Sequence, residues 1–197
     1  AAPFEAEATE RGNEILTALD AQILRASHIV TGLRQYVLTG ALERKLEPVA
    51  DVLAEALRLA RDSIAAAEAE ITLTVAQPLL RVPMNRVQIQ QVLVNLLTNA
   101  ADALLDAPQR SITVTAAQEG QVVRVAVADT GDGIRADIRD KLFSPLTTTK
   151  ASGMGLGLTI CRQIVEAHGG TLTCTENQPN GTTFAFTLPM EPSAGAA

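Results

Sequence analysis

The sequence predicts an α+β protein of 197 residues, in which a long amphipathic helix precedes a region of mixed helices and strands. In residues 1–70 the apolar positions recur every three or four residues, which is the periodicity of a helix. From residue 71 onward, β-branched runs alternate with helical patterns and with turns rich in glycine and proline. Aromatic residues are scarce, so alanine and leucine do most of the packing, which favours helix.

The composition argues against several classes of protein. The formal net charge is −6, from 16 basic and 22 acidic residues, which does not favour a general nucleic-acid-binding protein. Cys161 and Cys174 have the spacing of neither a CxxC pair nor a disulfide framework, so we expect a reducing, cytoplasmic environment. No apolar run approaches the roughly 18 residues of a membrane span, and no signal peptide pattern opens the chain, so we expect neither.

The first predicted helix carries a heptad pattern over three repeats. A second row of residues beside this seam widens the apolar face, which is typical of a helix in a bundle. Two interpretations stay open, an amphipathic core helix and a dimerisation helix. The residues of the seam are Leu16, Leu19, Ile23, Ala26, Val30, Leu33 and Val37.

Residues 47–106 predict a helix, a strand and a second helix. Pro48 stands near the start of the first helix, over about 47–67, where its missing N–H is tolerated. The segment ITLTVA at 71–76 alternates and is β-branched, so it predicts a strand. Leucine and valine at helical spacing predict a long helix over 85–106.

The rest of the chain predicts strands that alternate with two shorter helices. A segment rich in glycine, threonine and serine covers 144–155, and Gly169 and Gly170 end the helix that follows it. The predicted strands lie at about 111–117, 121–129, 171–176 and 182–188, the helices at about 135–142 and 156–168, and a disordered tail at 191–197.

Two asparagines, Asn95 and Asn99, lie four positions apart in the long helix, so both amides fall on one face. Asparagine is unfavourable inside a helix, and a pair among leucines needs partners. The amide oxygens could ligate a hard metal ion, or the amides could hydrogen-bond a phosphate. A pair of buried capping amides is the structural alternative.

The segment VADTGDGI places Asp129 at the end of a strand, before Gly131 and Gly133. The two glycines permit a tight turn and a close approach of the backbone. A buried carboxylate at this point can accept a hydrogen bond from an exocyclic amine such as that of adenine. An ordinary Asp-Gly turn has the same pattern.

The segment GMGLGLTI places Gly153, Gly155 and Gly157 before a helix, where their N–H groups and the helix N-terminus can form an anion site. It is not a P-loop, because no GK[ST] follows. Lys150 could reach a terminal phosphate, or it could be a solvated loop lysine. The segment GTTFAFTLP, with Thr182 and Thr183 directly after a glycine turn, is by itself an ordinary strand.

Taken together and in this order, the motifs resemble those of the ATP-binding domain of sensor histidine kinases, in the superfamily of gyrase B, Hsp90 and MutL. QVLVNLLTNAADAL resembles the N box, VADTGDGI and GMGLGLTI two glycine boxes, DKLFSPLTTTK the F box, and NGTTFAFTLP the final box. The branch that it resembles is the nitrogen-regulation and oxygen-sensing one. The resemblance implies a two-layer α/β sandwich, with a mixed sheet covered by helices on one face, after a long helix in a dimeric bundle.

The resemblance also implies roles for single residues. Asn99 would coordinate the Mg²⁺ that bridges the ATP phosphates, and Asn95 would line the same pocket. Asp129 would bind the adenine amino group, directly and through water. Gly131 and Gly133 would let the backbone approach the nucleotide.

A mobile ATP lid is implied over 135–156, with Phe143 as its anchor. The chain departs from the family pattern at Asn85, where the family usually has Asp, and at Asp102, where other branches have Lys. More of the positive charge that balances the phosphates would therefore come from Mg²⁺ and from the lysine before the second glycine box. The remaining implied contacts are Lys150, Gly153, Gly155, Gly157 and the N–H groups of Leu156 and Leu158 with the phosphates, and Thr182 or Thr183 with adenine.

The family's phosphoacceptor histidine is followed by an acidic residue and, five positions on, by a proline. His28 is followed by Ile29 and has Leu33 at the fifth position, so it lacks both features. Its surroundings resemble the second helix of the dimerisation hairpin instead. His168 precedes two glycines at a helix end, where an imidazolium would suit the helix dipole, so we predict a structural role. We therefore expect no catalytic histidine in this chain.

The sequence as a whole predicts the ATP-binding catalytic domain of a two-component sensor histidine kinase, which transfers the γ-phosphoryl group to a histidine absent from the chain and thence to a response regulator receiver domain. We expect a dimerisation helix at 1–46, the catalytic domain at 47–190 and a tail at 191–197. ATP and Mg²⁺ are the expected cofactors, and a homodimer through the first helix is the expected assembly. The alternatives are a non-catalytic nucleotide-binding or dimerisation module, and an ATPase of the same superfamily, which would carry Glu at the position of Asn95.

Overall fold

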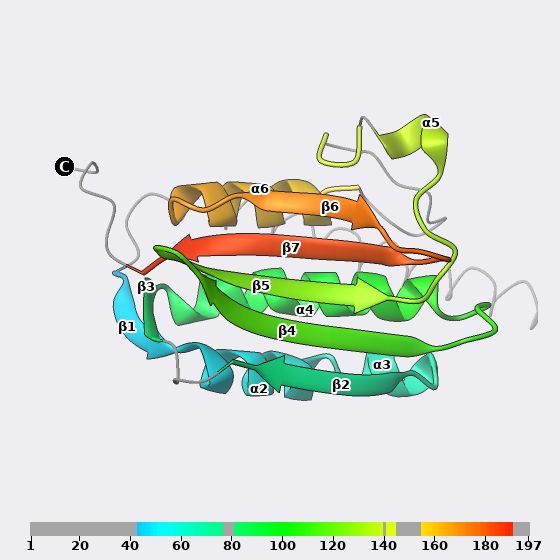
Figure 1. Ribbon diagram of the computed structural model, residues 1–197, viewed down its shortest axis with the longest axis horizontal. Helices are drawn as coiled ribbons and strands as arrows, with labels where there is room; N and C mark the ends of the chain where they lie inside the picture. Colours follow the sequence, from blue (N-terminus) through cyan, green and yellow to red (C-terminus); the bar gives the residue numbers. More distant parts are fainter. Residues whose placement is uncertain (1–42, 77–80, 140, 145–154, 191–197) are drawn as a thin grey trace, which may run out of the picture.

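The computed structural model describes residues 43–76, 81–139, 141–144 and 155–190. Its central sheet has five strands, which are β2 (Glu70–Val75), β4 (Ser111–Glu119), β5 (Val122–Asp129), β6 (Leu172–Glu176) and β7 (Thr182–Pro189). Their order across the sheet is β2-β4-β5-β7-β6 (Figure 1). β2 and β4 are parallel and the other neighbours are antiparallel, so the sheet is mixed, as predicted.

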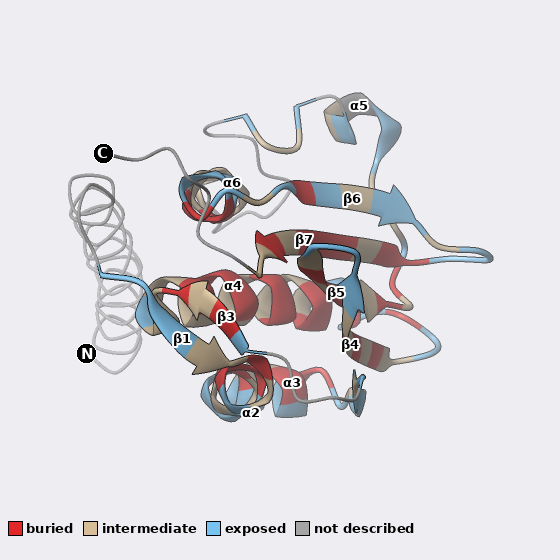
Figure 2. Ribbon diagram, turned by 60° about the vertical axis from the view of Figure 1, so that its left-hand side comes forward, coloured by how far each residue is buried: buried red, intermediate tan, exposed pale blue. Residues whose placement is uncertain are grey.

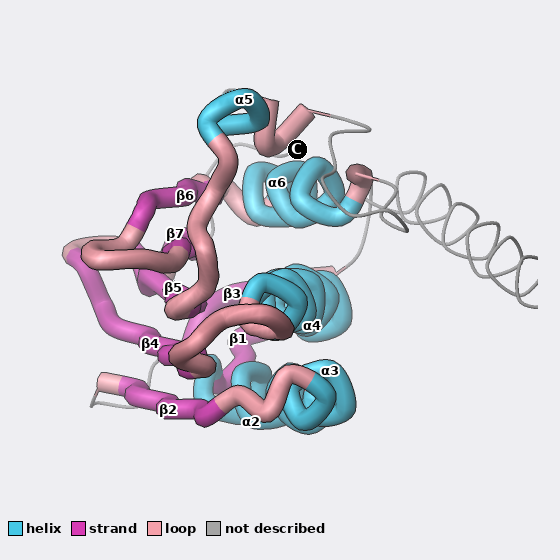
Figure 3. The backbone as a smooth tube through the Cα atoms, turned by 90° about the vertical axis from the view of Figure 1, so that its right-hand side faces the viewer, coloured by secondary structure: helices cyan, strands magenta, loops and turns pink. Residues whose placement is uncertain are grey.

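Helices cover one face of this sheet. They are α2 (Val49–Leu59), α3 (Arg61–Ala66), α4 (Arg86–Ala103) and α6 (Gly157–Ala167), and the short α5 (Ala136–Arg139) lies near the β6 edge. The side view in Figure 3 shows the strands in one layer and the helices in the other, with α4 between α6 and the α2–α3 pair. The predicted two-layer α+β sandwich is confirmed.

The core lies between α4 and the central strands (Figure 2). Along β4, Ile112 and Val114 are buried against the helices, while Thr113 and Thr115 alternate with them toward the uncovered face. Each fully buried leucine, isoleucine or valine contributes about 1.5–3 kcal/mol through the hydrophobic effect. This packing fixes α4 against the sheet, so α4 can hold polar side chains at defined positions.

The helix predicted over 47–67 is in fact two helices. Ala60 has φ −86° and ψ 0°, and it ends α2 and precedes α3. No glycine or proline marks the break, and the apolar pattern continues across it because Ala60 and Ile64 are both buried. The interruption between α2 and α3 is therefore not marked by any local sequence signal.

A two-stranded antiparallel ladder of β1 (Lys45–Pro48) and β3 (Arg81–Met84) is absent from the prediction. Each strand has only four residues and contains a proline, and Leu46 lies opposite Pro83. Proline is depleted in strands, and four residues are too few to display an alternating pattern. The ladder brings the first described residues of the chain next to the start of α4.

Several predictions concern residues outside the described ranges. These are the dimerisation helix up to residue 42 with His28, the Lys150 and Gly153 positions before α6, and the tail at 191–197. Among the residues that are described, no helix combines the length and the apolar character needed to cross a membrane.

His168 follows the last residue of α6 and is 3% exposed. Its Nδ1 lies 2.7 Å from the carbonyl oxygen of Ile164, and its Nε2 accepts the backbone N–H of Asn85 at 3.1 Å. Because Nε2 accepts, the ring proton is on Nδ1 and donates to Ile164. Burial lowers the pKa of His168, the Ile164 carbonyl opposes this change, and Arg44 adds to it. The structural role is as predicted, but the imidazolium is wrong, since a neutral ring ties α6 to the start of α4.

We expect the protein to lose stability as the pH falls below 6.5, the ordinary pKa of histidine. The pKa of His168 is lower in the folded than in the unfolded chain, so the unfolded chain binds more protons in this range. For one group the loss is at most about 1.4 kcal/mol per pH unit. Urea denaturation at a series of pH values measures it. His168→Gln is the control, since glutamine does not titrate, and an equal pH slope in both proteins would contradict the expectation.

Candidate nucleotide-binding site

Asp129 is the last residue of β5 and is 4% exposed. Its Oδ1 accepts the backbone N–H of Gly131 at 3.0 Å and that of Thr182 at 3.1 Å. Burial raises the pKa of this carboxyl above its ordinary range, while the two hydrogen bonds act in the opposite direction. Within the described residues, both hydrogen bonds to the carboxylate go to Oδ1. The group is therefore held in one orientation, and Oδ2 can accept from a further donor.

The turn after Asp129 packs against the end of α4. A Cβ atom added to Gly131 would lie 2.5 Å from the carbonyl oxygen of Ala103, the last residue of that helix. Gly133 has φ +81°, in the left-handed region that favours glycine. Both glycines that the sequence singles out are thus required by contacts and conformation within the protein, whatever the ligand.

Asn95 and Asn99 are half-buried on one face of α4, as their spacing predicts. The Nδ2 of Asn99 donates a hydrogen bond to the Oδ1 of Asn95 at 3.0 Å. This bond fixes the two amides relative to each other. It also shows that the two amides form one polar patch on this face of α4.

The first turn of α6 lies directly on this asparagine pair. A Cβ atom added to Gly157 would lie 2.5 Å from the Nδ2 of Asn95, so only glycine allows the approach without a shift. Gly155 has φ +64°, and Leu156 precedes the helix. The N–H groups at the start of a helix have no partner within the helix, and they carry a partial positive charge. The second glycine box and the N box are therefore adjacent in space.

Thr182 and Thr183 begin β7 and have different surroundings. Thr182 is buried, and its N–H contacts the Asp129 carboxylate. The hydroxyl of Thr183 donates to the Oδ1 of Asn177 at 2.7 Å. Asn177 in turn donates through Nδ2 to the backbone carbonyl of Asp129 at 3.0 Å. Sequence reasoning did not find Asn177, whose segment NQPNG carries only the general signature of a turn.

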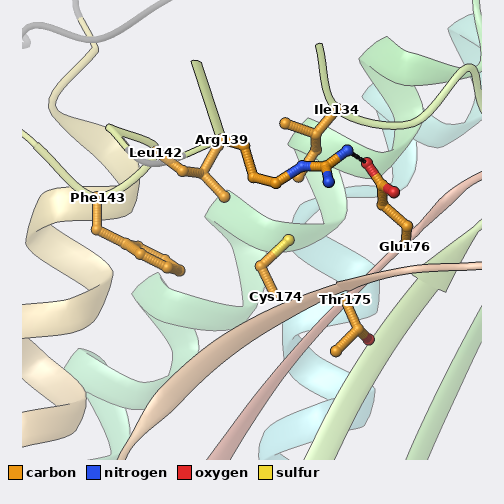
Figure 4. Close-up of a pocket in the computed structure, with 7 residues that line it drawn as sticks. All are labelled: Ile134, Arg139, Leu142, Phe143, Cys174, Thr175 and Glu176. Atoms are coloured by element: carbon orange, nitrogen blue, oxygen red, sulfur yellow. Dashed lines mark hydrogen bonds and ion pairs between the residues drawn. The ribbon is translucent and has the colours of Figure 1, made fainter. Parts of the chain in front are cut away.

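A cavity of about 330 Å³ lies between α5 and the end of β6 (Figure 4). Arg139 and Glu176 form an ion pair that joins these two elements. Burial raises the pKa of the Cys174 thiol to about 12, and the charges of Asp129 and Glu176 add to the effect. Such a thiol is neutral near pH 7 and a poor nucleophile. The cavity is lined by Ile134, Arg139, Leu142, Phe143, Cys174, Thr175 and Glu176.

Phe143 joins the segment after α5 to α6. Its carbonyl oxygen accepts the hydroxyl of Thr159 at 3.2 Å, and the guanidinium of Arg162 lies 5.9 Å from the centre of its ring. The side chain also packs against the hydrophobic core. These contacts tie Phe143 to α6 and to the core, and its role as the anchor of a lid stays a prediction.

Residues 84–192, more than half of the chain, match the sequence model of a family described as histidine kinase-, DNA gyrase B- and HSP90-like ATPases. The chain belongs to this family. The match spans α4, the turn after Asp129 and α6, which are the elements that form the candidate site.

Sensor proteins are among the similar curated proteins. The sensor protein FixL of Bradyrhizobium diazoefficiens is 38% identical over 169 residues, which cover 85% of this chain and 34% of FixL. The C4-dicarboxylate transport sensor protein DctB of Rhizobium meliloti is 37% identical over 164 residues, 83% of this chain and 26% of DctB. The chain thus spans between 26% and 34% of the length of these two relatives.

Solved structures of histidine kinases have the same fold. The catalytic domain of the histidine kinase ThkA superposes with a TM-score of 0.68 at 34% identity, covering 77% of this chain and 98% of that domain. ThkA in complex with the response regulator protein TrrA gives 0.70 at 30% identity, covering 88% of this chain and 50% of ThkA. The chain therefore contains the ATP-binding domain of a histidine kinase, as the motifs predict.

Proposed function

We propose that this chain binds Mg²⁺-ATP and forms the catalytic part of a two-component sensor histidine kinase. The kinase transfers the γ-phosphoryl group to a histidine outside this chain, and from there to a response regulator. The observation that carries the proposal is the buried Asp129 carboxylate, which two backbone N–H groups orient through Oδ1. A carboxylate held in this way selects a ligand with an amino group, and adenine has one.

The adenine end of the site is built around this carboxylate. In this proposal, Oδ2 of Asp129 accepts a hydrogen bond from the amino group of the base. The hydrogen bonds from Gly131 and Thr182 to Oδ1 hold the carboxylate in place. Thr182 and Thr183 flank the base position in this proposal. The close packing of Gly131 on the end of α4 sets the distance between the base position and the asparagine pair.

The phosphate end is formed by α4 and the start of α6. Asn95 and Asn99 present amides there, and the N–H groups of the first turn of α6, including those of Leu156 and Leu158, offer donors to anionic oxygens. Lys150 and Gly153, just before α6 in the sequence, complete the set in this proposal.

The donors present fit Mg²⁺ bound together with a phosphate ligand. Mg²⁺ takes oxygen ligands and commonly keeps several waters, with only one or two protein ligands beside the phosphates. Asn99 supplies one amide oxygen in this proposal. When bound, Mg²⁺-ATP supplies the phosphoryl group that is transferred.

The contribution of the chain to the reaction is positioning and electrostatic stabilisation. His168 cannot serve as the acceptor, because it is buried and both ring nitrogens are hydrogen-bonded. His28 lacks the residues that accompany a phosphoacceptor in this family. The acceptor histidine is therefore placed on another helix of the complete kinase.

The domain boundaries and partners belong to the same proposal. The second helix of a dimerisation hairpin lies within residues 1–46 and ends before β1, which begins at Lys45. Residues 47–190 form the catalytic domain, which β1 joins through its pairing with β3, and 191–197 form a tail. The heptad seam supports a homodimer. The structure of ThkA with its response regulator supports a receiver domain as the phosphoryl acceptor downstream of the histidine.

Calorimetric titration of Mg²⁺-ATP into the full chain tests the proposal. We expect saturable binding to the unmodified chain. The Asn99→Ala substitution should lower the affinity for Mg²⁺-ATP about tenfold or more. When EDTA removes Mg²⁺ and ATP alone is titrated, the same substitution should have a smaller effect, because Asn99 acts through the metal ion in this proposal. A separate hairpin that carries an acceptor histidine should then be labelled by radioactive ATP. Absence of saturable binding would favour a non-catalytic module. Steady hydrolysis without the acceptor would favour an ATPase of the superfamily.

A further inference from the structure

Asn177 opens the turn between β6 and β7, and this turn packs on the backbone of Asp129. The N–H of Asn177 donates to the carbonyl oxygen of Gly181 at 2.9 Å. At Gly181, with φ +106°, a Cβ atom would lie 2.0 Å from the carbonyl oxygen of Asp129. The turn is thus in direct contact with the peptide that carries the proposed base-binding carboxylate.

The half-buried side chain of Asn177 links three parts of the site. Its Nδ2 donates to the carbonyl oxygen of Asp129 at 3.0 Å, and its Oδ1 accepts the hydroxyl of Thr183 at 2.7 Å. The orientation of the amide is unambiguous, because a carbonyl can only accept a hydrogen bond. An aspartate at this position has the same shape but cannot donate to that carbonyl.

Asp129 is consequently held at both ends. Gly131 and Thr182 hold the Oδ1 of its carboxylate, and Asn177 holds its backbone carbonyl. With the bond from Thr183 to Asn177 included, four hydrogen bonds of defined geometry join the buried Asp129 to the turn after it, to Asn177 and to the start of β7.

We propose that Asn177 is a positioning residue that sets the selectivity of the site for an adenine base. The inference rests on the proposed function. Asn177 touches neither the base nor the phosphates in this proposal, but it fixes the Asp129 peptide and so the direction in which Oδ2 accepts.

The two ends of the proposed site predict a selective effect. Contacts to the base depend on Asp129, whereas contacts to the phosphates depend on Asn95, Asn99 and the start of α6. Asn177 is hydrogen-bonded to Asp129 and Thr183 at the base end of the site. In the part of the chain that the structure describes, Asn177 makes no hydrogen bond to the residues that form the phosphate end. Its loss should therefore weaken recognition of the amino group and leave the phosphate contacts in place.

The test compares ADP with inosine 5′-diphosphate, which carries an oxygen in place of the amino group. Calorimetry with Mg²⁺ measures both dissociation constants for the full chain, for Asn177→Asp and for Asn177→Ala. We expect both variants to raise the dissociation constant for ADP about five- to tenfold and to change that for inosine diphosphate less than about twofold. The ratio of the two constants is insensitive to partial unfolding, because unfolded chains reduce both signals equally.

Asn180→Asp is the matched control. It places the same charge in the same turn, but Asn180 is exposed, and we expect the ADP preference to be unchanged. An unchanged ADP preference in both Asn177 variants would overturn the inference and leave the proposed function intact. If the unmodified chain binds neither nucleotide, or does not prefer ADP, the proposed function fails and this inference fails with it.

Discussion

Asp129→Asn is expected to reduce the affinity for ATP and ADP on the order of 100-fold without unfolding the protein. Asparagine has the shape of aspartate, and its Oδ1 can still accept from Gly131 and Thr182. In place of Oδ2, however, it presents an N–H₂ group, which donates. The amino group of adenine would then meet a donor, and a buried donor that lacks an acceptor is costly. Calorimetric titration of ADP measures the loss.

The same substitution should leave stability unchanged or raise it. Burial raises the pKa of Asp129 in the folded state, so the charged carboxylate is disfavoured by folding above the ordinary pKa of 3.8. A group with a raised folded-state pKa stabilises the protein when protonated and loses this contribution as the pH rises through that pKa. The neutral amide avoids this cost at neutral pH. Urea denaturation near pH 7 should therefore give a free energy of unfolding no lower than that of the unmodified chain.

Asp132→Asn is the matched control for this experiment. Asp132 lies in the same turn and the substitution removes the same charge, but its side chain is exposed. We expect its nucleotide affinity to remain within about twofold. Equal losses in the two variants would show that overall charge, and not the oriented carboxylate, governs binding.

The parts of the fold that the sequence predicts are those that depend on local pattern. The long helix with Asn95 and Asn99, the strand that ends at Asp129 and the helix after Gly155 all follow from periodicity and punctuation. The hydrogen bond between the two asparagines follows from their spacing alone, because positions four apart share a helix face.

The parts that the sequence does not predict depend on contacts between distant segments. Asn177 is recognised by its bond to Asp129, which is 48 positions away. The β1–β3 ladder is stable because α2 and α4 bring its two short strands together, although neither has a strand pattern of its own. The neutral state of His168 depends first on its burial, which lowers its pKa, and its Nε2 accepts the N–H of Asn85, 83 positions away. These three features arise from contacts between segments that are distant in the sequence, so the residues next to them in the chain do not predict them.

Gly181→Ala is expected to lower the free energy of unfolding by about 3–5 kcal/mol, a large part of the roughly 5–15 kcal/mol of a typical domain. Two effects add. The φ of +106° is one that residues with a Cβ atom rarely adopt, and the new Cβ would lie 2.0 Å from the carbonyl oxygen of Asp129. Because the atom that it meets belongs to the backbone, no side-chain rotation relieves the overlap. The Asp129 peptide must move, which breaks its bond with Asn177.

Gly120→Ala separates the two effects. Gly120 has φ +62° in the turn between β4 and β5, but an added Cβ atom meets nothing within 4 Å. Conformational strain alone should therefore cost about 1–2 kcal/mol there, with nucleotide affinity unchanged. Urea denaturation and ADP titration of both variants measure the comparison. Equal losses of unfolding free energy in the two variants would contradict the expectation. They would show that the close packing of the β6–β7 turn on Asp129 does not hold the proposed base site together. If Gly181→Ala alone lost both stability and the preference for ADP, the turn that carries Asn177 would be as much a part of that site as the carboxylate it supports.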